Sequence, residues 1–203
     1  RGRIETVEHV IYIGDGETPE GLLNYEQLLA SAEPVEDAGR GYDDIAGLFY
    51  TGGTTGRSKG VMLSHANLTI NSYNAIPALG FWHGMRWLHA APMFHIADGC
   101  ATFGVTAMVG THVFIAAFTP AQTLAAVQHH RITHTLLVPT MVNMVVNAPD
   151  VGDYDLSSMK SVIYGASPMP EAVIVRAMEV MPGCGFTHAY GQTECAPLVT
   201  STG

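Results

Sequence analysis

Short runs of consecutive apolar residues alternate with helix-forming segments over most of the 203-residue chain. Such runs are typical of strands buried on both faces, because a half-exposed strand alternates apolar with polar side chains. We expect strands over residues 10–13, 45–51, 87–91, 111–115, 133–138, 161–164 and 185–189. We expect helices over residues 25–31, 64–78, 119–131, 139–147 and 170–181, with another beginning near residue 96. The pattern predicts an α/β fold, with a mainly parallel β-sheet flanked by helices on both faces.

Charged residues are unevenly distributed along the chain. Residues 1–45 carry 11 acidic and 3 basic side chains, whereas residues 46–203 carry only 7 and 6. The longer region is thus about 8% charged, against roughly 25% in an ordinary soluble domain. We interpret residues 1–45 as an acidic strand, helix and connector, and residues 46–203 as an incomplete α/β core covered by other parts of a larger protein. A polar surface rich in histidine and threonine is the alternative.

The composition also bears on partners and location. A net charge of −9 argues against a nucleic-acid partner, which requires a basic face. The uncharged run 99–118 is long enough to span a bilayer, but Gly110, Thr111 and His112 interrupt it. It therefore predicts a short buried helix followed by a buried strand, and peripheral membrane contact stays open. Acidic charge and three cysteines without a CxxC spacing favour the cytoplasm.

A loop rich in glycine and threonine follows the expected strand 45–51. Residues 50–60 read YTGGTTGRSKG. Glycines let backbone amides approach a polyanion closely, threonine hydroxyls add hydrogen-bond donors, and Lys59 adds a positive charge. The spacing matches neither the Walker loop nor GxGxxG. The composition predicts a phosphate-binding loop, and a glycine-rich hairpin without a ligand is the alternative.

Further polar motifs follow three of the other expected strands. Residues 91–99 read APMFHIADG, residues 164–170 read YGASPMP, and residues 186–194 read FTHAYGQTE. Parallel sheets bind ligands beyond the carboxyl ends of their strands, which is where these motifs fall. An aromatic ring suits a nucleotide base, and a glutamate oxygen suits a hard cation. The positions therefore predict a ligand-binding crevice.

Together these motifs resemble those of the adenylate-forming superfamily, which includes acyl-CoA synthetases, luciferases and amino-acid-adenylating domains. The family signature of the first loop reads roughly YTSGTTGxPKG, and here Gly53 replaces the serine and Ser58 the proline. The resemblance implies that this loop wraps the β- and γ-phosphates of ATP. The residues that it assigns to the phosphates are Thr51, Gly52, Gly53, Thr54, Thr55, Gly56 and Lys59.

The resemblance also assigns the carboxylate site. The P-x-F-H segment places His95 beside the carboxylate and acyl group. Amino-acid-adenylating domains tend to carry a phenylalanine–aspartate pair here, in which the acid binds the substrate ammonium. In this chain His95 follows Phe94, and Asp98 comes three residues later. This departure favours a carboxylic acid without an α-amino group.

By the same resemblance, the last two motifs bind the rest of the nucleotide. Tyr190 would stack on adenine, and Glu194 would ligate Mg²⁺. The family commonly has glutamine or asparagine where this chain has His188, and a neutral imidazole accepts through only one ring nitrogen. ATP affinity or base selectivity is therefore expected to differ. The other nucleotide-binding positions are Gly165, Ala166, Ser167, Gly191 and Thr193.

The implied function is ATP-dependent activation of a carboxylic acid, a fatty acid by preference, to acyl-adenylate and then acyl-CoA. Lys59, His95 and Glu194 are the expected catalytic residues, and ATP, Mg²⁺ and coenzyme A are the expected cofactors. The small-molecule partners are the acid and coenzyme A. An aryl-acid or amino-acid-adenylating ligase and a non-catalytic nucleotide-binding module stay open as alternatives.

The resemblance further implies a continuation. Family members continue to a TGD-like motif, a hinge and a C-terminal domain with a catalytic lysine, and TGD does not occur in this sequence. We therefore expect the chain to be an ATP- and acyl-binding part of the N-terminal domain. Its partner would be the C-terminal part of the same enzyme, and alone it is expected to be inactive.

Overall fold

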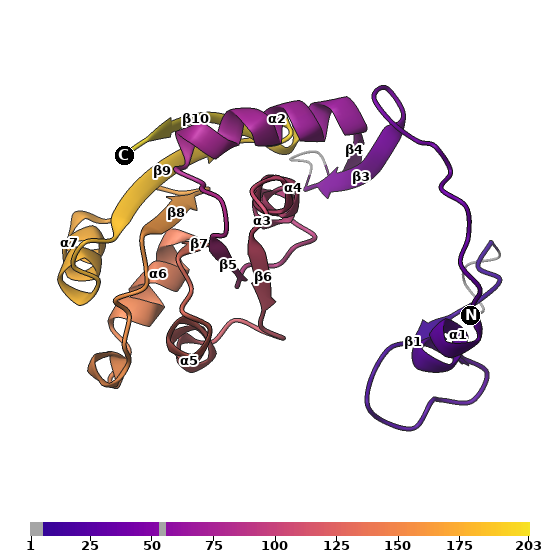
Figure 1. Cartoon of the computed structure of the whole chain (residues 1–203), viewed down its shortest axis with the longest axis horizontal. Helices are drawn as coiled ribbons and strands as arrows, with labels where there is room; N and C mark the ends of the chain where they lie inside the picture. The colour runs from indigo at the N-terminus through magenta and orange to yellow at the C-terminus, as the bar shows by residue number, and fades with distance from the viewer. Residues whose placement is uncertain (1–5, 53–55) are drawn as a thin grey trace. The chain divides into compact units, whose positions relative to one another are not determined.

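The computed structural model describes residues 6–52 and 56–203. They form two compact units, Arg1–Arg40 and Gly41–Gly203 (Figure 1). Three residues predicted to bind phosphate, Gly53, Thr54 and Thr55, lie outside the described residues.

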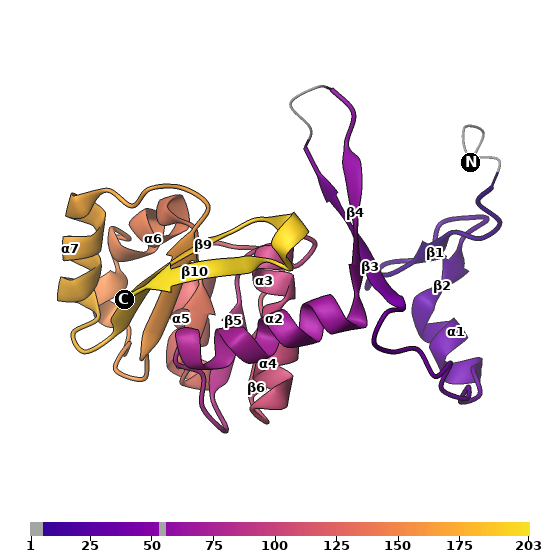
Figure 2. The same ribbon diagram turned by 90° about the horizontal axis from the view of Figure 1, so that it is seen from above.

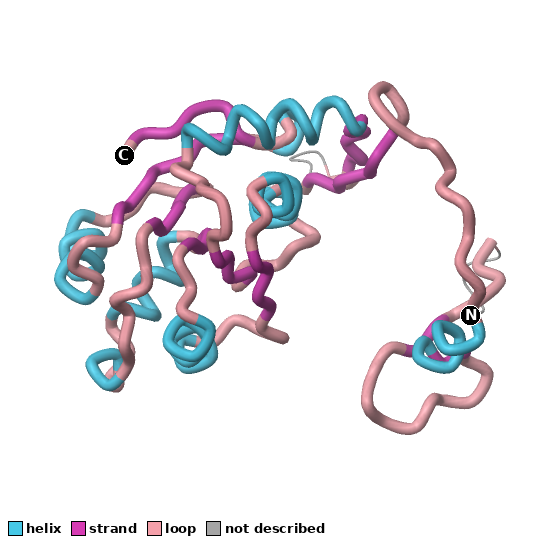
Figure 3. The backbone as a smooth tube through the Cα atoms, in the orientation of Figure 1, coloured by secondary structure: helices cyan, strands magenta, loops and turns pink. Residues whose placement is uncertain are grey.

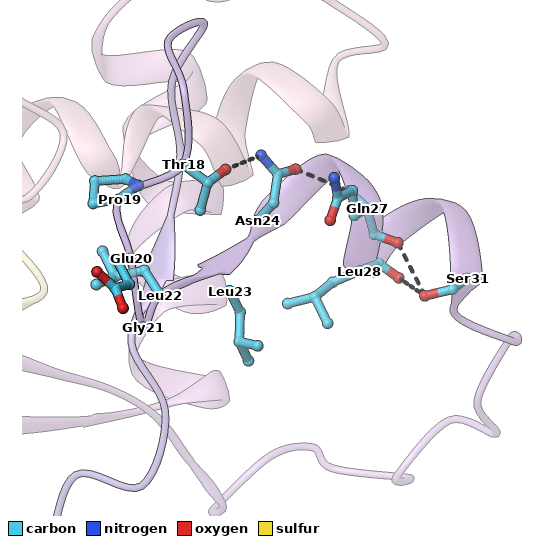
Figure 4. Close-up of a pocket in the computed structure, with 10 residues that line it drawn as sticks. All are labelled: Thr18, Pro19, Glu20, Gly21, Leu22, Leu23, Asn24, Gln27, Leu28 and Ser31. Atoms are coloured by element: carbon cyan, nitrogen blue, oxygen red, sulfur yellow. Dashed lines mark hydrogen bonds between the residues drawn. The ribbon is translucent and has the colours of Figure 1, made fainter.

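The first unit holds two short parallel strands and one helix. Strand β1 (Ile11–Tyr12) pairs with β2 (Leu23–Asn24), and α1 (Tyr25–Ser31) follows directly. The Asn24 side chain caps this helix by accepting a hydrogen bond from the Gln27 amide at 3.0 Å, because the first amides of a helix have no partner within it. A pocket of about 510 Å³ lies beside α1, lined only by residues between Thr18 and Ser31 (Figure 4).

The second unit contains a six-stranded sheet in the order β10-β9-β8-β7-β5-β6. The five strands β5 to β9 are parallel, and β10 runs antiparallel at one edge. Their bounds are Arg86–His89 (β5), Thr111–Phe114 (β6), His134–Leu136 (β7), Ser161–Gly165 (β8), Gly185–Gly191 (β9) and Leu198–Thr202 (β10). The predicted mainly parallel sheet is confirmed, and its carboxyl ends lie along one edge.

Helices cover both faces of this sheet (Figures 1 and 3). On one face, α5, α6 and α7 enclose the larger apolar core, which includes Leu124, Val142 and Val162. On the other face, α2 and α4 enclose a smaller core around Phe81, Trp87 and Val105. The helix bounds are His65–Ala78 (α2), Ile96–Gly99 (α3), Ala101–Ala107 (α4), Pro120–His130 (α5), Pro139–Val146 (α6) and Glu171–Val180 (α7). Within the described residues, no helix is both long and apolar enough to cross a membrane.

The first strand of the second unit does not join the large sheet. Strand β3 (Ile45–Thr51) pairs antiparallel with β4 (Lys59–Ser64), which the sequence did not predict. Figure 2 shows this hairpin rising away from the six-stranded sheet. Helix α2 begins directly after it, and the predicted Ser64 cap is confirmed, because the Ser64 hydroxyl accepts from the Asn67 amide while the Asn67 side chain accepts from the Ser64 amide.

The strand expected to be buried at residues 111–115 is an edge strand instead. Strand β6 has a single neighbour, β5, on its inner side, and the Phe114 side chain is 60% exposed. The prediction of burial was wrong because β6 is the last strand of the sheet, so its side chains are covered only in part. The helix expected to precede it is present as α3 and α4.

Candidate functional site

The two predicted nucleotide motifs lie side by side at the carboxyl ends of β8 and β9. In the parallel register, Tyr164 is opposite His188 and Gly165 is opposite Ala189. The rings of Tyr164 and His188 stack, with centroids 5.2 Å apart and planes 18° from parallel. Tyr190 belongs to the same strand and is 57% exposed. These neighbours present aromatic faces of the kind that a nucleotide base stacks against.

The turn after β8 depends on one glycine. A Cβ atom on Gly165 would lie 2.2 Å from the carbonyl oxygen of Ala189, so no other residue fits this close strand contact. The next residue, Ala166, has φ +67°, a left-handed conformation that an L-residue adopts at some cost. Ala166 and Ser167 are both exposed. The turn therefore offers backbone groups to a ligand, as the resemblance implies for adenine.

The YGQTE motif ends in a turn that α2 holds in place. The Asn71 side-chain amide donates to the carbonyl oxygens of Cys195 and Leu198 at 3.0 and 2.8 Å, and its oxygen accepts from the Leu198 amide at 3.2 Å. The turn contains the 3₁₀ helix η2 (Thr193–Cys195), in which Glu194 is exposed. The sequence analysis missed Asn71, because its partners lie more than 120 residues further along the chain.

Gly191 makes this turn possible. A Cβ atom at Gly191 would lie 2.2 Å from the carbonyl oxygen of Pro197, and the Gln192 amide donates to that same oxygen at 3.0 Å. The predicted role of Gly191 in nucleotide binding is not tested, but its local role is close packing of the turn.

The hairpin meets the other motifs at its base. One buried apolar cluster contains Leu63 of β4, Leu68 of α2, Ile96 of α3 and Ala196 beside η2. Phe49 and Val61, on the same face of the hairpin, pack against this cluster. Since Ile96 follows His95 and Ala196 comes two residues after Glu194, one cluster anchors three of the four predicted binding segments. This convergence is the principal geometric result for the site.

The end of the hairpin is less constrained by packing. Thr51 and Lys59 are partners in the strand ladder, so the motif 50–60 begins and ends within the two strands of the hairpin. The Thr51 hydroxyl donates to the Lys59 carbonyl at 3.5 Å. Gly56 has φ +92°, which favours glycine. Lys59 and Gly52 are exposed, and the Lys59 ammonium is available to an anion.

His95 stands at the start of α3 and is exposed, with the Phe94 ring 4.7 Å away between centroids. Asp98, in contrast, is 0% exposed. Its carboxylate accepts hydrogen bonds from the Trp87 indole and from His89 Nδ1, both at 3.0 Å. The carboxylate is thus enclosed and already paired, so a substrate ammonium has no access to it.

His89 continues into a network that the sequence analysis missed. Its Nε2 atom lies 2.9 Å from His112 Nδ1, and His112 Nε2 lies 3.1 Å from the Thr106 hydroxyl. Burial is the main cause that lowers the pKa of His112, the nearby His89 lowers it further, and Asp98 opposes both. The partners come from β5, β6 and α4, so only the parallel register of Trp87 opposite His112 brings them together.

Glu194 is the residue predicted to ligate Mg²⁺. Across residues 6–52 and 56–203, no group of three or more His, Cys, Asp or Glu side chains is arranged to hold a metal. Glu194 is exposed and has no ion pair within the part of the chain that the structure describes. Its carboxylate fits a cation whose other ligands are phosphate oxygens and water, which is how Mg²⁺ is commonly bound.

The fold defines the class of protein: an α/β unit in which the hairpin, the His95 loop and the turn that holds Glu194 share one apolar cluster. Residues 1–203 match the family described as AMP-binding enzyme, and the chain belongs to that family.

Relatives of known activity are acyl-CoA ligases. The chain is 37% identical over 174 residues to a feruloyl-CoA synthase of an Amycolatopsis species, covering 85% of this chain and 35% of the relative. It is 30% identical over 205 residues to a medium/long-chain-fatty-acid–CoA ligase of Mycobacterium tuberculosis, covering 98% of this chain and 35% of the relative. The chain thus spans about a third of the length of these relatives.

A solved structure supports the same fold. The long-chain-fatty-acid–CoA ligase of Archaeoglobus fulgidus matches with a TM-score of 0.71 and 29% identity, over 78% of this chain and 33% of that chain. The predicted kinship with acyl-CoA synthetases is confirmed, whereas the roles of individual site residues stay predictions.

Proposed function

We propose that the protein containing this chain is an AMP-forming acid–CoA ligase, and that residues 41–203 contribute its ATP- and carboxylate-binding surface. The observation that carries the proposal is the shared cluster of Leu63, Leu68, Ile96 and Ala196, which gathers the hairpin, the His95 loop and the turn that holds Glu194. The reaction requires all three at once, because the acid attacks the α-phosphorus while pyrophosphate leaves.

Electrostatics supplies most of the chemistry in this proposal. Lys59 and the neighbouring hydroxyls orient the phosphates that leave as pyrophosphate, and they stabilise the charge that develops there. Glu194 would hold Mg²⁺, which when bound neutralises phosphate charge. Tyr190, beside the stacked pair Tyr164 and His188, receives the adenine. His95 borders the substrate carboxylate.

The substrate is an acid without an α-amino group. This part of the proposal rests on Asp98, whose two carboxylate oxygens are occupied by Trp87 and His89 in the protein interior. An amino-acid substrate would require an accessible carboxylate to pair with its ammonium, since a buried unpaired charge is strongly unfavourable. The exposed residue beside the site is His95 instead.

A fatty acid is the first candidate substrate, and a hydroxycinnamic or other aryl acid is the second. The match to the fatty-acid–CoA ligase of Mycobacterium tuberculosis supports the first. The match to feruloyl-CoA synthase supports the second, as do the Phe94 and Phe114 rings, which are 78% and 60% exposed and offer flat apolar surfaces to an aromatic acid.

ATP–pyrophosphate exchange tests the proposal on the protein at its natural full length. The panel should include long-chain fatty acids, ferulic and coumaric acids, benzoate and an amino acid. We expect exchange with at least one acid that lacks an α-amino group, and none with the amino acid. Exchange that depends only on the amino acid, or on no acid at all, would refute the proposal and favour an adenylating ligase of the other type or a non-catalytic nucleotide-binding module.

A further inference from the structure

The hydrogen bonds around Asp98 form a continuous series. A carboxylate only accepts, so His89 Nδ1 carries a hydrogen and donates to it. His89 Nε2 is paired with His112 Nδ1, and His112 Nε2 is paired with the Thr106 hydroxyl, with the donor in each pair set by the tautomers of the two rings. The lowered pKa of His112 agrees with a neutral ring. Every polar atom in the series therefore has a partner, from buried Asp98 to exposed Thr106.

This series closes a loop that carries a predicted catalytic residue. His89 is the last residue of β5, and Asp98 lies in the four-residue helix α3. The eight residues between them, 90–97, include Phe94 and His95. The Asp98 carboxylate thus joins the two ends of the loop, through His89 directly and through Trp87 two residues earlier on the same strand.

Other contacts also hold the loop, since Ile96 is buried in the cluster around Leu63. A four-residue helix is too short to be stable by its own hydrogen bonds. Within the loop, the His95 amide donates to the Pro92 carbonyl at 3.0 Å. Met93 passes so close to Gly99 that a Cβ atom on this glycine would lie 2.6 Å from the Met93 carbonyl oxygen. The backbone around His95 is consequently fixed by tertiary contacts, and the Asp98 carboxylate is the one that joins the loop to β5 by side-chain hydrogen bonds.

We propose that Asp98 is a positioning residue for the carboxylic acid substrate: it fixes loop 90–97 so that His95 stands beside the acid, and it does not contact the substrate itself. The inference rests on the proposed function, because it takes His95 as the residue that borders the carboxylate. It adds a role for Asp98 and for its partners His89 and Trp87, which lie in the interior rather than in the site.

Steady-state kinetics of the full-length protein tests this role, with KM measured separately for the acid and for ATP. Asp98→Ala removes both hydrogen bonds, and we expect it to raise the KM for the acid at least tenfold while the KM for ATP changes less than twofold. Asp98→Asn is the matched variant: its amide oxygen accepts from Trp87 and its amide nitrogen donates to His89 in the other tautomer. We expect it to restore the KM for the acid to within threefold of the wild-type value.

Trp87→Phe provides a second route if Asp98→Ala does not fold. It removes one donor to Asp98 but keeps an aromatic ring in the core around Phe81 and Val105. We expect the KM for the acid to rise three- to fivefold with little change for ATP. A purely structural role would instead lower the active fraction, and hence kcat, and leave both KM values unchanged.

The possible results separate the two proposals. An unchanged KM for the acid in folded Asp98→Ala or Trp87→Phe, an equal rise in both KM values, or an Asn variant as impaired as the Ala variant would overturn the positioning role. Failure of the wild-type protein to exchange pyrophosphate with any acid would refute the proposed function, and the positioning role with it.

Discussion

Two segments of this molecule that are predicted to touch the substrates are held in very different ways. Loop 90–97 is tied at both ends through a buried carboxylate. Its own Ile96 is 5% exposed, and Trp87 and His89 on the preceding strand are 1% and 3% exposed. The β3–β4 hairpin is held at its base by the cluster around Leu63. Toward its end, Tyr50 is 70% exposed and Lys59 is exposed.

The difference matches what each segment has to bind. A carboxylate that is about to react needs a fixed angle and distance to the α-phosphorus, and buried hydrogen bonds supply a fixed geometry. Phosphates carry several negative oxygens and are bound by many donors at once, which exposed glycine-rich backbone and a long lysine side chain provide. We therefore expect loop 90–97 to fix the geometry of the substrate carboxylate, and the hairpin to supply positive charge to the phosphates.

The largest effect on stability should come from adding one methyl group at the carboxyl end of β8. Gly165→Ala places a Cβ atom against the Ala189 carbonyl, and we expect the free energy of unfolding to fall by about 3 kcal/mol or more. The matched variant in the hairpin, Gly56→Ala, meets no atom of the described residues within 4 Å, and its cost of about 1 to 2 kcal/mol comes from φ +92°. Urea unfolding measures both changes, and equal losses would break the comparison.

We expect acid to lower the free energy of unfolding by a similar amount. This loss comes from a histidine of the six-stranded sheet and not from the hairpin. His134 on β7 is buried against Trp82 and Trp87, and burial lowers its pKa from 6.5 to about 4. Between these two pKa values the unfolded chain binds a proton that the folded chain does not. Stability from this group is therefore complete above pH 6.5 and is lost as the pH falls toward 4, by about 3 kcal/mol in total.

Trp82 and Trp87 are the two tryptophans of the chain, so fluorescence reports unfolding around His134 directly. We expect His134→Leu to remove most of the difference in unfolding free energy between pH 7 and pH 4.5, and His83→Leu, at an exposed position, to retain it. An unchanged pH dependence in His134→Leu would show that other groups cause the acid sensitivity.

The smallest of these effects concerns binding rather than stability. Lys59→Gln removes the positive charge at the hairpin, and we expect the Kd for ATP to rise about tenfold, equivalent to about 1.4 kcal/mol, without a change in unfolding free energy. Lys160→Gln is the control, because Lys160 is also exposed but precedes β8 at its amino end. Calorimetric titration gives both values. An equal rise in both variants would mean that general charge, not the hairpin, attracts ATP.

Much of the fold follows from the sequence, because local signals and tertiary packing agree. The helix at residues 25–31 and the strand at 45–51 have the expected bounds, and Ser64 caps α2 as its position predicts. Strand β4 was missed because it starts with Lys59 and Gly60, which favour loops. Its pairing with β3 is antiparallel and local, whereas the surrounding pattern indicated parallel strands.

The site was predictable only in part. Each motif is a continuous stretch of sequence, so the resemblance identified it. The structure brings residues that flank three of the motifs into one apolar cluster. Asn71, His89 and His112 carry no local signal, because an asparagine in a helix and a histidine in a strand are ordinary. Their partners are set by strand register and helix packing, which depend on contacts between residues far apart in the chain.

Photolabelling with 8-azido-ATP tests the central claim most directly, namely that one site on the second unit binds the nucleotide. The account predicts labelled peptides that contain residues 164–170 or 188–194, protection by excess ATP, and weaker labelling of Lys59→Gln. Labelling confined to other peptides, or labelling that excess ATP does not prevent, would contradict it.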